Sequence, residues 1–345
     1  MELTKVYAQN AGKKNIDLTL SINPLGCSPC AIRALKNFAA DDVSRYPNTG
    51  PLINALTKKF RVSKDNIVLG NGSEQLIKLI SQTFLKKGDL ALVQVASFPL
   101  FTKESQIAGA KVAFFDPENP LSSVNPSVLF MSNPSTPTGE VFSRKTVTSL
   151  IKTFPDAIIV IDEANGEFAD GASFINNAKE SSNVIILRTF SKVLGLAGVR
   201  IGCAIGASVI IQKLQDVQQA FVVSSIACKL AVASLNDQEF ISKTKKFIAT
   251  ERATLTSALV KRGFTVSNSV TNNLFVSRPD AKQIIQQLSD RSVSVIDGSF
   301  FPGLTTPGFR ISIKDKKTNK LFLQKLDEVL ACTNKNKLIL SKEVV

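Results

Sequence analysis

The sequence lacks histidine altogether, since none of its 345 residues is a histidine. This absence excludes serine–histidine–aspartate triads, metal sites with imidazole ligands, and imidazole acids or bases. Any acid–base chemistry near neutral pH must therefore come from lysine, aspartate, glutamate, tyrosine or a bound cofactor. A lysine with nucleophilic character satisfies this restriction.

Cysteine is also scarce. The chain has five cysteines, an odd number without the spacing of a disulfide framework, which predicts a reducing compartment. Cys27 and Cys30 form a Cys-x-x-Cys pair around Pro29, but no second pair and no histidine completes a metal site. We predict no metal ion, and a structural role for this pair rather than a redox role.

Long apolar runs are missing as well. No run approaches the roughly 20 residues that span a bilayer, and residues 1–14 have no apolar core of the signal-peptide type. The net charge of +14 suggests nucleic acid or membranes, but the lysines and arginines are spread along the whole chain without a dense basic block. These features predict a soluble, cytoplasmic protein with a small-molecule substrate and with neither a nucleic-acid nor a membrane partner.

What the chain does have is one lysine in an unusual setting. The run at residues 183–188 predicts a buried parallel strand, so Thr189, Ser191 and Lys192 should lie at or just beyond its carboxyl end, where open α/β sheets bind ligands. Desolvation or a neighbouring cation lowers the pKa of an amine, which can then form a Schiff base with an aldehyde cofactor. Lys192 is therefore our candidate nucleophile, and Arg200 is a candidate phosphate clamp.

An acidic residue ends another apolar run. Residues 158–161 read Ile-Ile-Val-Ile, and Asp162 follows them. A carboxylate in that place can pair with a protonated pyridine nitrogen and keep the ring of such a cofactor an electron sink. Taken alone, an aspartate at a strand end is most often a turn or cap residue. The order of Asp162 and Lys192 along the chain is what favours the catalytic hypothesis.

A strand, a glycine turn and an amphipathic helix are predicted over residues 67–80. Gly72, Ser73 and Glu74 stand at the start of the helix, where free backbone N–H groups and the positive end of the helix dipole attract anions. Ser73 by itself could be no more than an N-cap. We predict that these three residues meet a phosphate group through their backbone.

Together these motifs resemble the pyridoxal-phosphate enzymes of fold type I. The resemblance rests on Asp162-Glu163-Ala164, on Ser191-Lys192 with Arg200, and on the Asn-Pro-x-x-Pro-Thr-Gly signature at residues 133–139. It covers nearly the whole chain. The branch that the sequence resembles holds histidinol-phosphate aminotransferase and threonine-phosphate decarboxylase.

The resemblance implies an α/β fold, in which a large domain has a mostly parallel central sheet between helices and a smaller domain is α+β. Residues 1–35 would form an N-terminal segment that joins the small domain, residues 36–225 the large cofactor-binding domain, and residues 226–345 the small domain. It also implies pyridoxal 5′-phosphate as the cofactor and a homodimer in which Tyr46 reaches the neighbouring site.

The resemblance assigns roles to single residues. Lys192 would hold the cofactor and move the substrate's α-proton, Asp162 would meet the pyridine nitrogen, and Phe98 would stack on the ring. Arg310 would hold the substrate's α-carboxylate as a bidentate fork, and Asn23 would border the substrate.

Two positions depart from the pattern of the family. Thr136 stands where an asparagine usually binds the phenolic oxygen of the cofactor, and Asn165 stands where a tyrosine is common. Thr136 retains a hydroxyl donor, and Asn165 can supply an amide. Both changes concern the same oxygen, so the electronics and the binding strength of the cofactor depend on them.

The function that the resemblance implies is an aminotransferase for an amino acid or an amino-acid-derived, possibly phosphorylated, substrate. Ile22–Gly26 and Phe301–Leu304 resemble the threonine-phosphate decarboxylase instead, which is the alternative hypothesis, although the His-Gly-Gly-Asn segment of that branch is missing. A non-catalytic relative is the third hypothesis. Thr136 and Asn165 motivate it, and the presence of Lys192 weighs against it.

Overall fold

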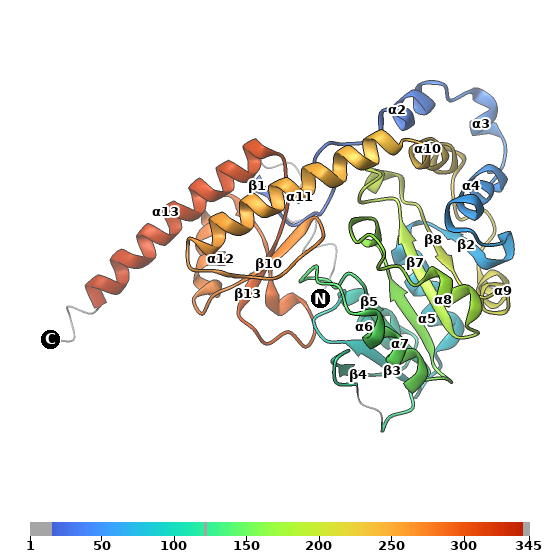
Figure 1. The fold of residues 1–345 in the computed structure, drawn as a ribbon, viewed down its shortest axis with the longest axis horizontal. Helices are drawn as coiled ribbons and strands as arrows, with labels where there is room; N and C mark the ends of the chain where they lie inside the picture. The colour runs from blue at the N-terminus through green and yellow to red at the C-terminus, as the bar shows by residue number, and fades with distance from the viewer. Residues whose placement is uncertain (1–15, 121–122, 341–345) are drawn as a thin grey trace.

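The computed structural model describes residues 16–120 and 123–340, with residues 333–340 as backbone only. This part of the chain forms a larger and a smaller lobe, and helix α11 (Gln238–Val260) runs from one to the other (Figure 1). The larger lobe contains a seven-stranded sheet and the smaller lobe a four-stranded one. None of the helices in the described ranges has an apolar stretch long enough to cross a lipid bilayer.

Short β-branched runs build the central sheet. Its inner strands are buried on both faces, which is typical of parallel strands covered by helices. All strands run parallel except β8, which is antiparallel to both of its neighbours. From one edge to the other the strands are β2 (Ile67–Gly70), β8 (Gly202–Ile205), β7 (Val184–Thr189), β6 (Ile158–Asp162), β5 (Val128–Ser132), β3 (Leu90–Gln94) and β4 (Lys111–Phe115).

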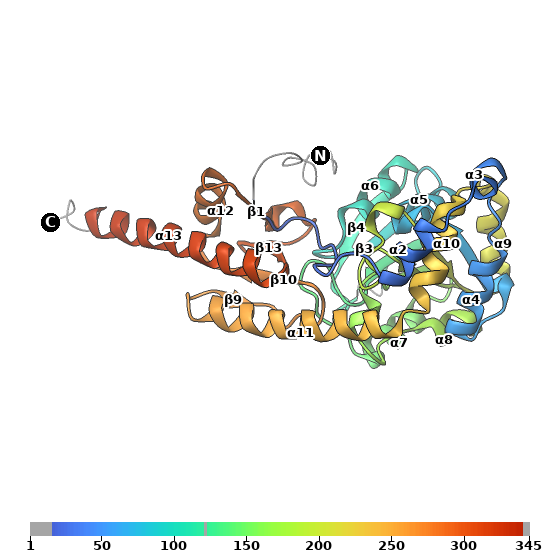
Figure 2. The ribbon, with the colours of Figure 1, turned by 90° about the horizontal axis from the view of Figure 1, so that it is seen from above.

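Two separate apolar cores cover the two faces of this sheet, because alternate strand residues point to opposite sides. The first core includes side chains of α2 (Pro29–Lys36), α4 (Gly50–Phe60), α7 (Arg144–Thr153), α8 (Ile175–Glu180) and α10 (Ser225–Leu235). The second includes side chains of α5 (Gly72–Phe84), α6 (Pro99–Ile107) and α9 (Ser208–Val217). The short helix α3 (Ala40–Ser44) lies on the outside of the larger lobe (Figures 1 and 2).

The smaller lobe is built on an antiparallel sheet with the order β12 (Ile296–Asp297), β13 (Gly308–Ser312), β10 (Asn273–Ser277) and β9 (Thr265–Val266). Helices α11, α12 (Ala281–Asp290) and α13 (Lys316–Leu340) bury their apolar faces in its core. The N-terminal strand β1 (Ile16–Asp17) pairs in parallel with β11 (Val293–Ser294), so the start of the described chain belongs to this lobe (Figure 2).

The α/β fold with a mostly parallel sheet is confirmed, and the predicted strands lie where the sequence indicates. The sequence predicts a long helical region from about Ser208 to Arg262, and the structure confirms it. Three helices occupy it, with breaks at residues 218–224 and 236–237. The division into segments 1–35, 36–225 and 226–345 stays a prediction, and residues 1–15 and 341–345 lie outside the described ranges.

Candidate active site

The functional side chains come from the carboxyl ends of neighbouring parallel strands. Strand β6 ends at Asp162 and β7 at Thr189, three residues before Lys192, while β3 and β5 end at Gln94 and Ser132. The carboxyl ends of parallel strands meet at one edge of a sheet, which is where this fold class binds its ligands. The sequence therefore concentrates its polar candidates along one edge.

Lys192 is half-buried, and its pKa is lowered to about 8. Burial is the main cause and the positive charge of Arg310 the next, while the carboxylate of Asp162 opposes them. The Thr189 hydroxyl donates to Ser191 Oγ at 2.9 Å, and the Ser191 N–H donates to Thr189 Oγ1 at 3.3 Å. These bonds fix the turn that carries Lys192. Because its pKa is lowered to about 8, a substantial fraction of the amine is neutral near pH 8.

Asp162 is 8% exposed, and burial raises its pKa to about 6. The backbone N–H of Ala164 donates to Asp162 Oδ1 at 2.8 Å, which favours the charged form, as does the positive charge of Lys192. A buried carboxylate of this kind is stabilised by a further cation. It suits a protonated ring nitrogen.

The start of α5 forms an anion seat. The N-cap Asn71 makes no side-chain capping bond, so the first N–H groups of the helix remain available. Gly72 has φ +80°, and a Cβ there would lie 2.7 Å from Arg200 Nη2. Arg200 Nη2 also lies 3.3 Å from Glu74 Oε2, and its Nη1 donates to the carbonyl of Ala197 at 3.1 Å. A guanidinium and free helical N–H groups thus meet at one place.

The anion seat also depends on a close contact between the backbones of β8 and α5. A Cβ at Gly202, the first residue of β8, would lie 3.1 Å from the backbone nitrogen of Ser73. Glycine is therefore required at this position for β8 to pack beside the first turn of α5. The structure brings Gly72, Ser73, Glu74 and Arg200 together as the sequence predicts.

The loop after β5 places Thr136 in a half-buried position. Gln94 braces this loop, because its Nε2 donates to Ser135 Oγ at 2.9 Å and its Oε1 accepts from the Ser132 N–H at 2.8 Å. Asn165 lies just beyond β6, and its buried Oδ1 has no hydrogen-bond partner within the described residues. Buried polar atoms are normally paired, so this amide marks a place that a bound group completes.

The two aromatic candidates differ in their surroundings. Phe98 immediately precedes α6, is half-buried, and packs edge-on against Phe101 with ring centroids 6.0 Å apart. Tyr46 is 79% exposed and stacks on Phe221 at 4.4 Å. No described contact joins Tyr46 to Lys192 within the same chain.

Arg310 is 6% exposed and reaches the site from the middle of β13. Its Nη2 donates to the carbonyl of Thr19, its guanidinium lies 5.8 Å from the ring of Phe301, and its Nε has no partner in the described part of the chain. A buried guanidinium with a spare donor is suited to a carboxylate.

Asn23 connects the N-terminal segment to the lysine. Its Nδ2 donates to the carbonyl of Val193 at 2.9 Å and to Thr244 Oγ1 at 3.2 Å, while its Oδ1 accepts from the Leu25 N–H at 2.9 Å. Asn23 thus lies beside the predicted site, with its side chain engaged by protein groups. Its role in substrate binding stays a prediction.

Residues at the end of β13 and just after it hold the same N-terminal segment. Ser312 Oγ lies 2.9 Å from Ser21 Oγ, and Lys314 Nζ donates to the carbonyl of Leu20 at 2.7 Å. Together with the Arg310 bond to Thr19, these contacts fasten the segment to β13. Residues 19–23 therefore connect Arg310 to the loop that carries Lys192.

The sequence did not predict a buried ion pair beside the candidate residues. Glu163 and Arg188 form a buried ion pair of 2.7 Å next to Asp162 and Thr189. The available signal was a charged residue at the end of each of two otherwise apolar runs, since a charge in such a place requires a partner.

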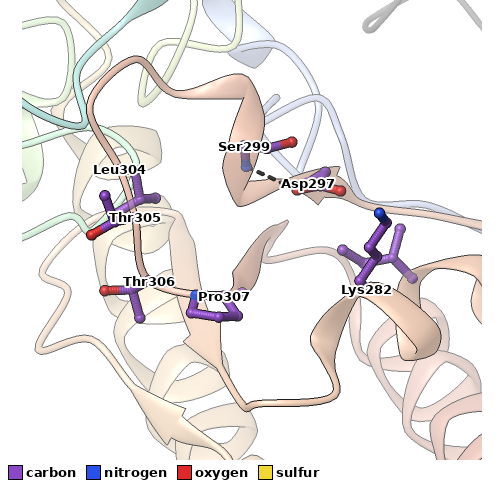
Figure 3. Close-up of a pocket in the computed structure, with 9 residues that line it drawn as sticks. Lys282, Asp297, Ser299, Leu304, Thr305, Thr306 and Pro307 are labelled. Atoms are coloured by element: carbon purple, nitrogen blue, oxygen red, sulfur yellow. Dashed lines mark hydrogen bonds between the residues drawn. The ribbon is translucent and has the colours of Figure 1, made fainter.

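A surface hollow of about 240 Å³ in the smaller lobe is a separate feature. Figure 3 shows Asp297 and Ser299 on one side of it, Thr305 and Thr306 on another, and Lys282 of α12 across from them. Its lining includes none of the candidate residues named above. The hollow is therefore not part of the candidate site.

A family model described as aminotransferase class I and II matches residues 13–326. The chain belongs to this family. This class I and II aminotransferase is 30% identical to the histidinol-phosphate aminotransferase of Moorella thermoacetica, over 95% of this chain and 89% of the relative. It is 31% identical to that of Caldicellulosiruptor saccharolyticus, over 95% of each chain.

Solved structures agree on the fold of this aminotransferase. The histidinol-phosphate aminotransferase from Sinorhizobium meliloti in complex with pyridoxal-5′-phosphate superposes with a TM-score of 0.88 at 24% identity, covering 96% of each chain. The L-threonine-O-3-phosphate decarboxylase from Porphyromonas gingivalis gives 0.77 at 20% identity, covering 91% of this chain and 99% of the other. The predicted family, fold and enzyme class are confirmed.

Proposed function

We propose that this protein is a pyridoxal-phosphate-dependent aminotransferase that acts like a histidinol-phosphate aminotransferase on an amino-acid-derived substrate. The observation that carries the proposal is the pairing of Lys192, whose pKa is lowered to about 8, with Asp162, a buried carboxylate whose pKa is raised to about 6. When bound, pyridoxal phosphate supplies an aldehyde and an electron-withdrawing ring.

The residues of the site fit this cofactor. The first turn of α5 and Arg200 would hold its phosphate, Asp162 its ring nitrogen and Phe98 one ring face. Asn165 supports the fit independently, because its buried oxygen has no partner in the described residues. Thr136, in the loop after β5, can add a hydroxyl donor.

Lys192 and Arg310 of β13 would carry out the proton transfer and the orientation of the substrate. Lys192, neutral in part near pH 8, takes the proton from the substrate's α-carbon and returns it at the next stage. Arg310 orients the substrate through its α-carboxylate, because a fork of two N–H donors fixes direction as well as position. The pose that this fork selects decides which bond at the α-carbon breaks.

The direct experiment supplies histidinol phosphate and 2-oxoglutarate to the purified protein with pyridoxal phosphate and measures glutamate. We expect glutamate to form, and to form faster than with a panel of common amino acids as donors. Absence of glutamate with every donor, from protein that has bound the cofactor, would rule out the proposal.

A decarboxylase that acts on O-phosphothreonine is the second candidate. The observation that favours it concerns Phe301, which belongs to the segment that resembles the decarboxylase branch. Its ring centroid lies 5.8 Å from Cζ of Arg310, the residue proposed to bind the carboxylate. Incubation with O-phosphothreonine alone and measurement of carbon dioxide distinguishes it from transamination. A cofactor-bound protein that neither releases carbon dioxide nor transfers an amino group would be the non-catalytic relative.

Arg310→Lys is expected to raise KM for the amino donor by about 10-fold to 100-fold, since a hydrogen bond to a charged group contributes about 1.5–3 kcal/mol. The cation remains, but the fork is lost. Steady-state kinetics measures the change. Lys314→Met is the matched control, because it removes a contact between the chain just after β13 and the N-terminal segment and leaves the fork in place. Equal rises of KM in both variants would contradict the assignment.

The exposed aromatic pair supports a homodimer. Tyr46 and Phe221 are 79% and 58% exposed, Val43 close by in sequence is 74% exposed, and a hollow of about 640 Å³ is lined by Pro47 and Phe221. Apolar side chains gathered in this way are typical of a protein–protein interface. A second copy of this chain, with Tyr46 directed at its phosphate seat, is the partner that we propose.

Tyr46→Ala is expected to weaken binding of pyridoxal phosphate by about 10-fold, if its hydroxyl donates to the phosphate of the neighbouring subunit. The decisive measurement mixes this variant with Lys192→Ala after dissociation and reassociation of the subunits. At a pyridoxal phosphate concentration that leaves Tyr46→Ala largely empty, the mixture should be more active than either variant alone, because hybrid dimers contain one site with both intact residues. Mixtures that are no more active than Tyr46→Ala alone, although hybrids form, would contradict a shared site.

A further inference from the structure

A buried ionic cluster lies directly behind the site. Arg188 Nη2 donates to Glu163 Oε2 at 2.7 Å, and Arg188 Nη1 lies 3.3 Å from Glu167 Oε1. Glu163 also accepts from the Phe174 N–H at 2.6 Å and from the Ser173 hydroxyl at 2.8 Å. Burial raises the pKa of Glu163, and the charge of Arg188 and the two hydrogen bonds oppose that effect.

The cluster and the site occupy opposite faces of the same two strand ends. Asp162 and Glu163 are consecutive, as are Arg188 and Thr189, and consecutive strand residues point to opposite faces of a sheet. The residues two positions before Glu163 and Arg188 belong to the core under α4 and α8. The residues that lie two positions before Asp162 and Thr189 belong to the other core, under α5. The Arg188–Glu163 ion pair therefore joins β6, which ends at Asp162, to β7, which leads to Lys192, on the face of the sheet opposite the site.

Stability alone does not account for this pair. The Glu163 and Arg188 side chains are 1% and 8% exposed, and well-packed apolar residues of similar volume often stabilise a fold at least as well as a buried ion pair. The position of the guanidinium is narrowly defined. A Cβ at Gly166 would lie 2.6 Å from Arg188 Nη1, and the ring of Phe60 in α4 lies 5.5 Å from Arg188 Cζ.

The charges of the pair act on Asp162 with opposite signs. The positive charge of Arg188 lowers the pKa of Asp162, and the negative charge of Glu163 raises it. Burial pushes the same carboxyl group towards its neutral form. Arg188 thus supports the charged form of Asp162 from the far side of the sheet.

We propose that Arg188, fixed in place by Glu163, is a positioning residue that holds the ends of β6 and β7 together and so keeps the Asp162 carboxylate in position for the ring nitrogen of the cofactor. The inference rests on the cofactor role proposed for Asp162. It predicts that residue 188 and the ring nitrogen are coupled, although they lie on opposite sides of the sheet.

The test compares two ligands by their dissociation constants from cofactor-free protein, with no turnover involved. One is pyridoxal phosphate, and the other is its 1-deaza analogue, in which carbon replaces the ring nitrogen. The native protein should prefer pyridoxal phosphate by about 10-fold or more, as expected for a charge-assisted hydrogen bond. Arg188→Gln should reduce this preference by about 5-fold, and Glu163→Gln should reduce it in the same direction, because either change breaks the ion pair that fixes the ends of β6 and β7.

Ile186→Ala is the matched control. It lies on the same strand and the same face as Arg188, and it should lower thermal stability while leaving the ratio of the two constants unchanged. Equal losses of both affinities in Arg188→Gln would overturn the inference. If that variant does not fold, an unchanged ratio in Glu163→Gln overturns it instead. Native protein without any preference would refute the cofactor role of Asp162 itself, which separates the two failures.

Discussion

Lys192→Ala is expected to lower kcat by roughly 10⁴-fold or more and to remove the visible absorbance of the lysine-bound cofactor. The substitution deletes both the covalent attachment and the base that moves the α-proton, and a general base alone contributes about 10²–10⁴-fold. Stopped-flow absorbance and glutamate formation measure the two losses separately.

The pH dependence of cofactor capture belongs to the same prediction. Only the neutral amine attacks an aldehyde, so the rate of capture by cofactor-free protein should rise with pH through a midpoint near 8, where burial places the pKa of Lys192. An ordinary lysine would give a midpoint near 10.5. The sign follows from the amine, which is protonated and unreactive below its pKa and free to react above it.

Two further variants distinguish loss of the nucleophile from a general loss of folded structure. Lys192→Arg keeps the positive charge but should be as inactive as Lys192→Ala, because a guanidinium does not form the covalent link. Lys282→Ala removes an exposed lysine of the smaller lobe and should leave both kcat and absorbance unchanged. Retained absorbance and turnover in Lys192→Ala would refute the assignment of the nucleophile.

The strands and the strand-end residues were predictable because each depends on a short stretch of sequence. Apolar β-branched runs such as residues 158–161 and 184–187 indicate strands buried on both faces. The carboxyl ends of parallel strands share one edge, so Asp162 and Lys192 could be placed there before any contact was known. The start of α5 followed from the same reasoning, since a glycine turn after a strand opens a helix.

The pairing of β8 was not predictable in the same way. Residues 202–205 indicate a strand, but nothing local shows that it enters between β2 and β7 in the antiparallel direction. That placement brings Gly202 against the first turn of α5, where only glycine fits. The anion seat therefore depends on a contact between distant segments.

The breaks in the long helical region also lie beyond local patterns. Residues 208–262 contain neither glycine nor proline, so the sequence offers no strong breaker. The chain turns after α9, with Phe221 at φ +56°, and the side chain of Asp237 caps α11 by accepting from the Phe240 N–H at 3.2 Å. The same packing exposes Phe221 beside Tyr46 on the proposed dimer surface.

Asp162→Asn is expected to lower kcat by about 10³-fold and, at the same time, to stabilise the cofactor-free protein. The loss follows because a neutral amide no longer balances a protonated ring nitrogen, and removal of one preorganised electrostatic group costs about 10²–10³-fold. The gain follows because an amide has no charge to bury. Without the cofactor, the buried charge of Asp162 destabilises the folded protein.

The pH window of the gain is set by the pKa of Asp162, which is raised from 3.8 to about 6 in the folded protein. Below pH 4 the carboxyl is protonated in both the folded and unfolded states, so native protein and variant should have similar free energies of unfolding. Between pH 4 and 6 the unfolded chain ionises first, and the native protein loses up to about 3 kcal/mol relative to the variant. Above pH 6 the difference stays constant. Urea unfolding of both proteins at several pH values measures it.

Asp170→Asn is the matched control for this last experiment. Its carboxylate is 84% exposed and pairs with Lys245 at 2.5 Å, so the same chemical change there should alter the free energy of unfolding by less than about 1 kcal/mol. Saturation with pyridoxal phosphate should reverse the order at Asp162, because the bound cofactor favours the charged native side chain over the amide. A variant that is less stable than the native protein at pH 8 without cofactor would show that Asp162 is ionised there at no cost, and that its charge is satisfied by the protein alone.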